Sequence, residues 1–244
     1  MSEHLYSLPT AIPTSPADLD APVPPIEAVL FDFANTLFRM LPTQRYLARI
    51  WEQAGRDPAS LDATAVAHQV HAARELPHVA AAQHGRDISL ERHREATYAW
   101  FTEVPAFAGI EEIAYQAVFD LASWYPYTDT EPVLRALAER GIPIGIVSDI
   151  PFDLRKNFAA AGLGDLIGAY ALSYELGVEK PDPRMFLTAC ADLGADPRRT
   201  LMVGDNAPRD GGAVACNIRV LLLPAEPREG DRGLDAVLRL VTGR

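Results

Sequence analysis

From about residue 127 onward, short continuous apolar runs alternate with stretches whose apolar residues recur every three or four positions. The continuous runs are typical of strands buried on both faces, and the spaced stretches are typical of amphipathic helices. Together with one earlier run, the expected strands cover residues 28–31, 142–147, 169–173, 200–203 and 220–223. The expected helices cover 130–141, a stretch from about 152, 183–193 and 212–216. This alternation predicts an α/β fold with a mostly parallel, Rossmann-like sheet.

Residues 41–126 show a different pattern. Their apolar side chains follow helical spacing, as at Leu47, Ile50 and Trp51, and predict three or four helices with no convincing strand. All three tryptophans lie in this stretch, and we expect them to form its core. We therefore expect a helical domain inserted into an α/β core made of residues 27–40 and 127–244.

The first 26 residues hold six prolines and several acidic residues but no Lys or Arg. Such a segment buries too little apolar surface to offset the entropy lost on ordering. We predict a flexible, Pro-rich arm over residues 1–26.

The charge balance narrows the function classes. The 244-residue chain carries 22 basic and 33 acidic residues, a net charge of −11, which argues against nucleic-acid binding and against docking on anionic membranes. No segment approaches the ~20 apolar residues of a membrane span, and the N-terminus shows no secretory signal. The two cysteines, Cys190 and Cys216, are expected to be buried thiols, which fits a cytoplasmic location.

Polar residues follow the expected strands where those strands end. Asp32, Ser148 and Asp205 stand at three strand ends, and ligands of parallel α/β sheets bind outside the carboxyl ends of the strands. Asp32 is a carboxylate suited to attack on phosphorus or to metal binding. Lys180, in the loop 177–183, supplies a positive charge, and Asp205 with Asp210 forms an acidic pair suited to magnesium.

Four segments containing these residues resemble the motifs of the haloacid dehalogenase (HAD) superfamily of hydrolases. They are Phe31-Asp32-Phe33-Ala34-Asn35-Thr36-Leu37-Phe38, Ile146-Val147-Ser148, Lys180-Pro181-Asp182-Pro183 and Gly204-Asp205-Asn206-Ala207-Pro208-Arg209-Asp210-Gly211-Gly212-Ala213. They occur in the family's order and span most of the chain after the arm. The insert at 41–126 resembles the family's helical cap, which closes over the active site.

The resemblance implies a role for each matching position. Asp32 is the nucleophile that forms an aspartyl-phosphate, and Ser148 and Lys180 hold the phosphoryl group. Asp149, after Ser148, is a candidate to contact the substrate. The implied magnesium ligands are Asp32, Asp205, the backbone carbonyl of Ala34 and Asp210, the last as a ligand or as a support for the others. We expect Gly211 and Gly212 to allow close packing after this metal loop.

One position departs from the family pattern. Most phosphatases of the family carry a second Asp, which protonates the leaving group and later activates water, where this chain has Ala34. A methyl group does neither, and losing a positioned acid/base costs about 10² to 10⁴ in rate. Four explanations stay open: a substrate with a good leaving group, a substitute such as Asp149 or a cap histidine, a phosphonate hydrolase, or a binding protein without turnover or an engineered change at this position.

Two branches of the HAD superfamily fit the sequence less well. The phosphonate-cleaving branch also has Ala here but uses a cap lysine, whereas this chain has only Lys156 and Lys180, both outside the cap. The 2-haloacid dehalogenase branch lacks the second Asp and needs no metal, but its fourth motif does not resemble Gly204-Asp205. We therefore expect a Mg²⁺-dependent hydrolase of a small phosphorylated metabolite, with a silent phospho-ligand-binding protein as the alternative. The pattern gives no indication of the oligomeric state.

Overall fold

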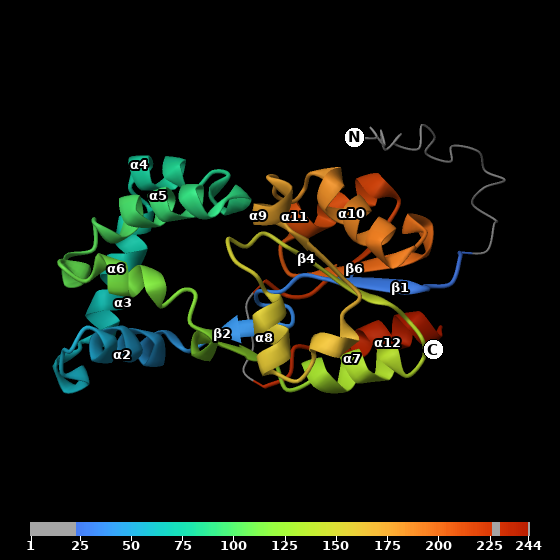
Figure 1. Cartoon of the computed structure of the whole chain (residues 1–244), viewed down its shortest axis with the longest axis horizontal. Coiled ribbons are helices and arrows are strands. Elements are labelled where there is room, and N and C mark those ends of the chain that lie inside the picture. The colour runs from blue at the N-terminus through green and yellow to red at the C-terminus, as the bar shows by residue number, and fades with distance from the viewer. Residues whose placement is uncertain (1–22, 226–229, 244) are drawn as a thin grey trace.

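A computed structural model describes residues 23–225 and 230–243 of the chain (Figure 1). The predicted arm falls mostly on residues 1–22, which lie outside the described residues. At the junction with the core Ile26 is buried, and the Glu27 N–H donates to the Arg199 carbonyl at 2.7 Å. In the described part of the chain, no helix is long and apolar enough to cross a membrane.

The centre of the core is a five-stranded parallel sheet with the order β5-β4-β1-β6-β7. Its strands are β1 (Ala28–Phe31), β4 (Ile144–Ser148), β5 (Ala169–Leu172), β6 (Thr200–Gly204) and β7 (Arg219–Leu222). The three central strands are buried along their whole length. All five strands and their parallel arrangement were predicted from continuous apolar runs, and the α/β class is confirmed.

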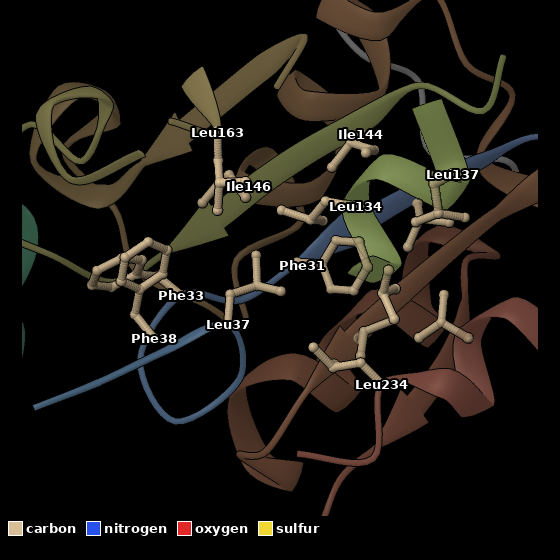
Figure 2. Packing of buried hydrophobic residues seen from close by; sticks show 14 of the residues in the cluster. Phe31, Phe33, Leu37, Phe38, Leu134, Leu137, Ile144, Ile146, Leu163 and Leu234 are labelled. Atoms are coloured by element: carbon tan, nitrogen blue, oxygen red, sulfur yellow. The ribbon is translucent and has the colours of Figure 1, made fainter. Parts of the chain in front are cut away.

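Helices cover both faces of this sheet (Figure 1). The core helices are α7 (Thr130–Ala138), α8 (Arg155–Ala160), α9 (Ser173–Leu176), α10 (Pro183–Leu193), α11 (Ala207–Asp210) and α12 (Asp235–Thr242), with the 3₁₀ helix η7 (Gly211–Cys216). Leu134, Leu137 and Leu234 pack on Phe31 at one face, as Figure 2 shows. Cys190 and Cys216 are buried free thiols in the cluster at the other face, as predicted.

The inserted segment is helical and lies at one end of the molecule (Figure 1). Its helices are α2 (Thr43–Gln53), α3 (Ala63–Arg74), α4 (Pro77–Ala82), α5 (Leu90–Phe101) and α6 (Glu111–Gln116). It has a hydrophobic cluster of its own, in which Trp51 is buried and against which Trp100 packs. We call residues 41–123 the cap.

Three predictions for this segment were wrong: the number of α-helices, which is five in this fully described segment and not three or four, the absence of a strand, and the place of Trp124 in the cap core. Residues Trp124–Pro126 form strand β3, which pairs antiparallel with β2 (Phe38–Met40) in a two-stranded ribbon. Trp124 therefore packs on the α/β core, with its ring 5.1 Å from that of Phe33, and not in the cap. Strands of three residues are too short to show alternation, and their pairing depends on residues more than 80 positions away.

Candidate active site

The strand order brings the predicted residues to one edge of the sheet. Asp32 follows β1, the central strand, and its N–H donates to the Val203 carbonyl of β6 at 2.9 Å. Asp205 follows β6, and the buried Ser148 ends β4 on the other side of β1. Parallel neighbours end at the same edge, so three residues separated by up to 173 positions share one site.

Lys180 joins the acidic residues of the site. Its ammonium donates to Asp32 Oδ1 and to Asp210 Oδ1, each at 2.6 Å, and all three side chains are at most 9% exposed. Among the described residues, Asp32 Oδ2 has no hydrogen-bond partner. The lysine therefore fixes one oxygen of Asp32 and leaves the other available for chemistry.

Burial and neighbouring charges shift the pKa values of Asp32 and Lys180. Burial, together with the nearby carboxylates of Asp210 and Asp205, raises the pKa of Asp32 to about 7 against the opposing effect of Lys180. Burial by itself lowers the pKa of Lys180, but the carboxylates of Asp32 and Asp210 outweigh it and raise that pKa above its ordinary value. The site therefore holds more negative charge than one lysine neutralises.

The same carboxylates fit a hard divalent cation. Asp32, Asp205 and Asp210 each offer an oxygen, and these oxygens lie within 4.8 Å of one another. Asp210 is held in place, because its Oδ2 accepts the Asn206 N–H at 2.8 Å and its Oδ1 accepts from Lys180. Gly204 permits this arrangement, since a Cβ there would lie 2.1 Å from Asp210 Oδ2. An all-oxygen donor set of this kind suits Mg²⁺.

Both carboxylate oxygens of Asp149 are engaged by other residues. Its Oδ1 accepts the backbone N–H of Lys180 at 2.8 Å, and its Oδ2 pairs with the Arg209 guanidinium. Arg209 Nη1 also lies 3.4 Å from Glu179 Oε2. Both oxygens of Asp149 thus hold the loop that carries Lys180, which argues against its use as a substitute acid.

Gly212 packs against that same loop, whereas Gly211 does not. A Cβ on Gly212 would lie 2.3 Å from Pro181 Cβ, but a Cβ on Gly211 would meet nothing within 4 Å. The expectation of close packing is confirmed for Gly212 and wrong for Gly211.

This pair of glycines gives a matched test. We expect Gly212→Ala to push Pro181 and Lys180 out of place, lowering stability by about 1–3 kcal/mol and turnover by roughly 10²-fold. Gly211→Ala, at a helical φ of −60°, should keep activity and leave stability unchanged or slightly raised. Thermal unfolding and phosphatase assays of the two variants check this, and equal effects would contradict it.

Arg232 is a site residue that the sequence analysis missed. Its side chain is 2% exposed, and its Nε donates to the carbonyl of Asn35, in the loop after Asp32, at 2.5 Å. Its positive charge opposes the rise in pKa that burial and Asp210 cause at Asp205. Asp129 accepts three backbone N–H groups of residues 232–234 and so fixes this loop.

The cap reaches the core through the 3₁₀ helix η2 (Arg86–Ile88). The Asp87 N–H donates to Glu179 Oε1 at 2.9 Å, and Ser173 Oγ donates to the Asp87 carbonyl at 2.6 Å. Glu179 precedes Lys180, so the cap is tied to the loop that carries the catalytic lysine candidate.

A cavity of about 520 Å³ lies between the cap and this edge of the core. Ala34 and Asp149 line its core side, and Arg86 and His71 are among its cap residues. Two other arginines of the cap, Arg92 and Arg94, pair instead with Glu95 and Glu112 on exposed surface.

The cavity wall also contains a buried pair that the sequence analysis did not single out, Asp87 and His93. Burial raises the pKa of Asp87, and burial with the nearby charge of Arg86 lowers the pKa of His93 to about 3. His93 is therefore neutral at physiological pH. Periodicity marked neither residue, because their burial depends on how the cap packs against the core.

Comparison with known proteins shows the family of the chain. A profile of the haloacid dehalogenase-like hydrolases matches residues 26–216. The chain belongs to this family. Glyceraldehyde 3-phosphate phosphatase of Methanopyrus kandleri is 28% identical to this HAD hydrolase over 195 residues, 76% of this chain and 78% of the relative. Phosphoserine phosphatase of Thermus thermophilus is 32% identical over 122 residues, so the match spans about half of each protein.

Solved structures show the same fold. The HAD-hydrolase YfnB of Bacillus subtilis, solved bound to magnesium, superposes with a TM-score of 0.66 at 13% identity, covering 89% of this chain and 99% of YfnB. A 2-haloacid dehalogenase of Pseudomonas syringae gives a TM-score of 0.58 at 19% identity over 89% of this chain and 99% of its own. The two relatives by sequence described above are phosphatases, and the chain is a phosphatase-like HAD hydrolase.

Proposed function

We propose that this hydrolase cleaves a small organic phosphate through an aspartyl-phosphate at Asp32, with Mg²⁺ as its cofactor. The observation that carries the proposal is the arrangement around Lys180. This buried cation holds Asp32 Oδ1 and Asp210 Oδ1 at 2.6 Å while Asp32 Oδ2 has no partner among the described residues. A carboxylate held on one side and free on the other is positioned for attack on phosphorus.

In this proposal the reaction has two steps. Asp32 Oδ2 forms a bond to phosphorus while the bond from phosphorus to the leaving-group oxygen breaks, and water then cleaves the aspartyl-phosphate to phosphate and free Asp32. Lys180 and Ser148 hold the phosphoryl oxygens. Mg²⁺, held by Asp32, Asp205, the Ala34 carbonyl and Asp210, would neutralise charge on the phosphoryl group when bound.

Ala34 restricts the substrates. The methyl group provides no proton for the leaving oxygen, and both oxygens of the neighbouring Asp149 are engaged. We infer that the preferred substrates have leaving groups that depart without an acid, such as acyl phosphates or activated esters.

Ala34 also favours a second candidate function, that of a binding protein. If no group replaces the missing acid, the protein binds a phosphorylated ligand without turning it over. A dehalogenase is supported less well, because that branch needs no metal, whereas Asp205 and Asp210 form an acidic cluster with Asp32 here. A phosphonate hydrolase is supported less well, because that branch uses a cap lysine and both lysines of this chain lie outside the cap.

Hydrolysis of acetyl phosphate with and without Mg²⁺ tests the proposal. We expect turnover that is lost on chelation by EDTA and restored by added Mg²⁺. If acetyl phosphate is stable but Mg²⁺ with inorganic phosphate raises the melting temperature, the binding-protein candidate replaces the enzyme. Turnover unaffected by chelation would contradict the proposed metal.

A further inference from the structure

The cavity beneath the cap has mostly apolar walls. It measures about 520 Å³, within the range of pockets that hold small organic ligands. Aromatic rings from three parts of the chain contribute to it: Tyr46, Trp100, Phe101, Phe107 and Trp124. Aliphatic side chains such as Leu47 and Val70 also line it.

The cavity meets the proposed chemistry at Ala34. This residue lies two positions after Asp32 and is half-buried, and it lines the cavity together with Asp149. A phosphate held at Asp32, Lys180 and Ser148 would therefore direct its organic group past the Ala34 methyl into the cavity.

The walls offer few free polar groups to a sugar. Arg86 donates to Gln83 and Asp87, and Arg74 lies over the Trp100 ring. Thr43 and His71 line the cavity with polar atoms that make no such contacts among the described residues. Asp87, His93 and Thr97 line the cavity, yet all three are more than nine-tenths buried, and Asp87 Oδ1, His93 Nδ1 and Thr97 Oγ1 lack partners among the described residues and are covered by neighbouring atoms. A ligand with many hydroxyl groups would lose more hydrogen bonds to water here than the few free side chains of the walls replace. An aromatic ring would lose nothing of this kind and would gain contact with the aromatic walls.

The chemistry at Ala34 points independently to the same class of ligand. Without an acid at this position, the leaving oxygen must depart as a weakly basic anion. The oxygen of a phenol is far less basic than that of an alcohol or a sugar, so an aryl ester requires less help from a proton donor.

We propose that the cap cavity binds the aromatic ring of an aryl phosphate monoester whose phosphate occupies the site at Asp32. This inference rests on the proposed function for the position of the phosphate. It adds the substrate class, which it takes from the cavity walls and from the absence of an acid at Ala34.

Binding of non-hydrolysable phosphonates tests the inference without requiring turnover. Calorimetry with Mg²⁺ present should show benzylphosphonate binding at least about tenfold tighter than methylphosphonate, because only its ring reaches the apolar walls. Glucose 6-phosphate should bind no tighter than methylphosphonate under the same conditions. The ratio of the first two affinities is the quantity to compare between variants.

Helix α3 supplies a matched pair of variants. Ala67 lines the cavity, whereas Ala65 is exposed on the same helix and does not line it. Ala67→Trp should fill the cavity and reduce the affinity ratio to about one, while Ala65→Trp should keep the wild-type ratio. Methylphosphonate binding by each variant shows that its phosphate site is still folded.

The outcomes separate this inference from the proposed function. Equal affinities of the wild-type protein for the two phosphonates, or tighter binding of glucose 6-phosphate, would overturn the inference even if acetyl phosphate is hydrolysed. An unchanged ratio in Ala67→Trp would also overturn it. Tight benzylphosphonate binding with no hydrolysis of any phosphate would leave the cavity assignment in place and reject the enzyme.

Discussion

Replacing Asp32 with asparagine is expected to lower acetyl phosphate hydrolysis by on the order of 10⁴-fold or more, because no other carboxylate takes over the attack. Asp205 and Asp210 lie close enough to share a cation, but Lys180 and the Asn206 N–H each hold one oxygen of Asp210. An amide is nearly the same size as the carboxylate, so the variant tests the chemistry of Asp32 with little change of shape. Steady-state kinetics with saturating Mg²⁺ measures the loss.

Stability measurements separate lost chemistry from lost folding. Burial raises the pKa of Asp32 to about 7, against about 3.9 in an unfolded chain. Between these values the folded protein binds more protons than the unfolded one, so the metal-free wild type loses stability as pH rises through this window. Asp32→Asn lacks this component, and its melting temperature relative to wild type should increase from pH 5 to pH 8.

A charge-matched control completes the test. Asp165→Asn removes one carboxylate from an exposed position in the 3₁₀ helix η5 (Gly164–Leu166), outside the four motif segments, and should keep wild-type activity. Retained hydrolysis by Asp32→Asn would contradict the aspartyl-phosphate. Equal losses in both variants would point to a general effect of charge.

Elements of the fold could be predicted where the sequence pattern that specifies them is local. The strand at 28–31 and the helix at 183–193 were predicted at their observed bounds. The strand is a continuous apolar run that is buried on both faces, and the helix begins at a proline and ends before a glycine. The ribbon of β2 and β3 has no such local signal, because three-residue strands depend on their distant partner.

The site shows the same division. Asp32, Lys180 and Asp210 were predicted from motifs at strand ends and in a loop, and Lys180 Nζ lies 2.6 Å from one carboxylate oxygen of each aspartate. Arg232 and Asp87 were missed because neither stands in a periodic pattern. Arg232 reaches the loop after Asp32 from a segment near the C-terminus, and Asp87 reaches Glu179 from the cap, so only tertiary packing reveals them.

Replacing Ala34 with aspartate is expected to raise turnover of alkyl phosphates by roughly 10² to 10⁴, the usual contribution of a positioned acid/base. Ala34 is half-buried and lines the cap cavity, so the larger side chain has room. The gain should be small for acetyl phosphate and aryl phosphates, whose leaving groups need little protonation. Kinetics on a series of esters of decreasing leaving-group acidity measures the difference.

Ala34→Asn is the control, because it fills the same space but transfers no proton, and it should show no gain on any ester. If Ala34→Asp also gains nothing and the wild type already hydrolyses alkyl and aryl phosphates equally well, the acid comes from elsewhere. A gain confined to Ala34→Asp instead identifies the methyl group as the reason why this hydrolase requires an activated ester.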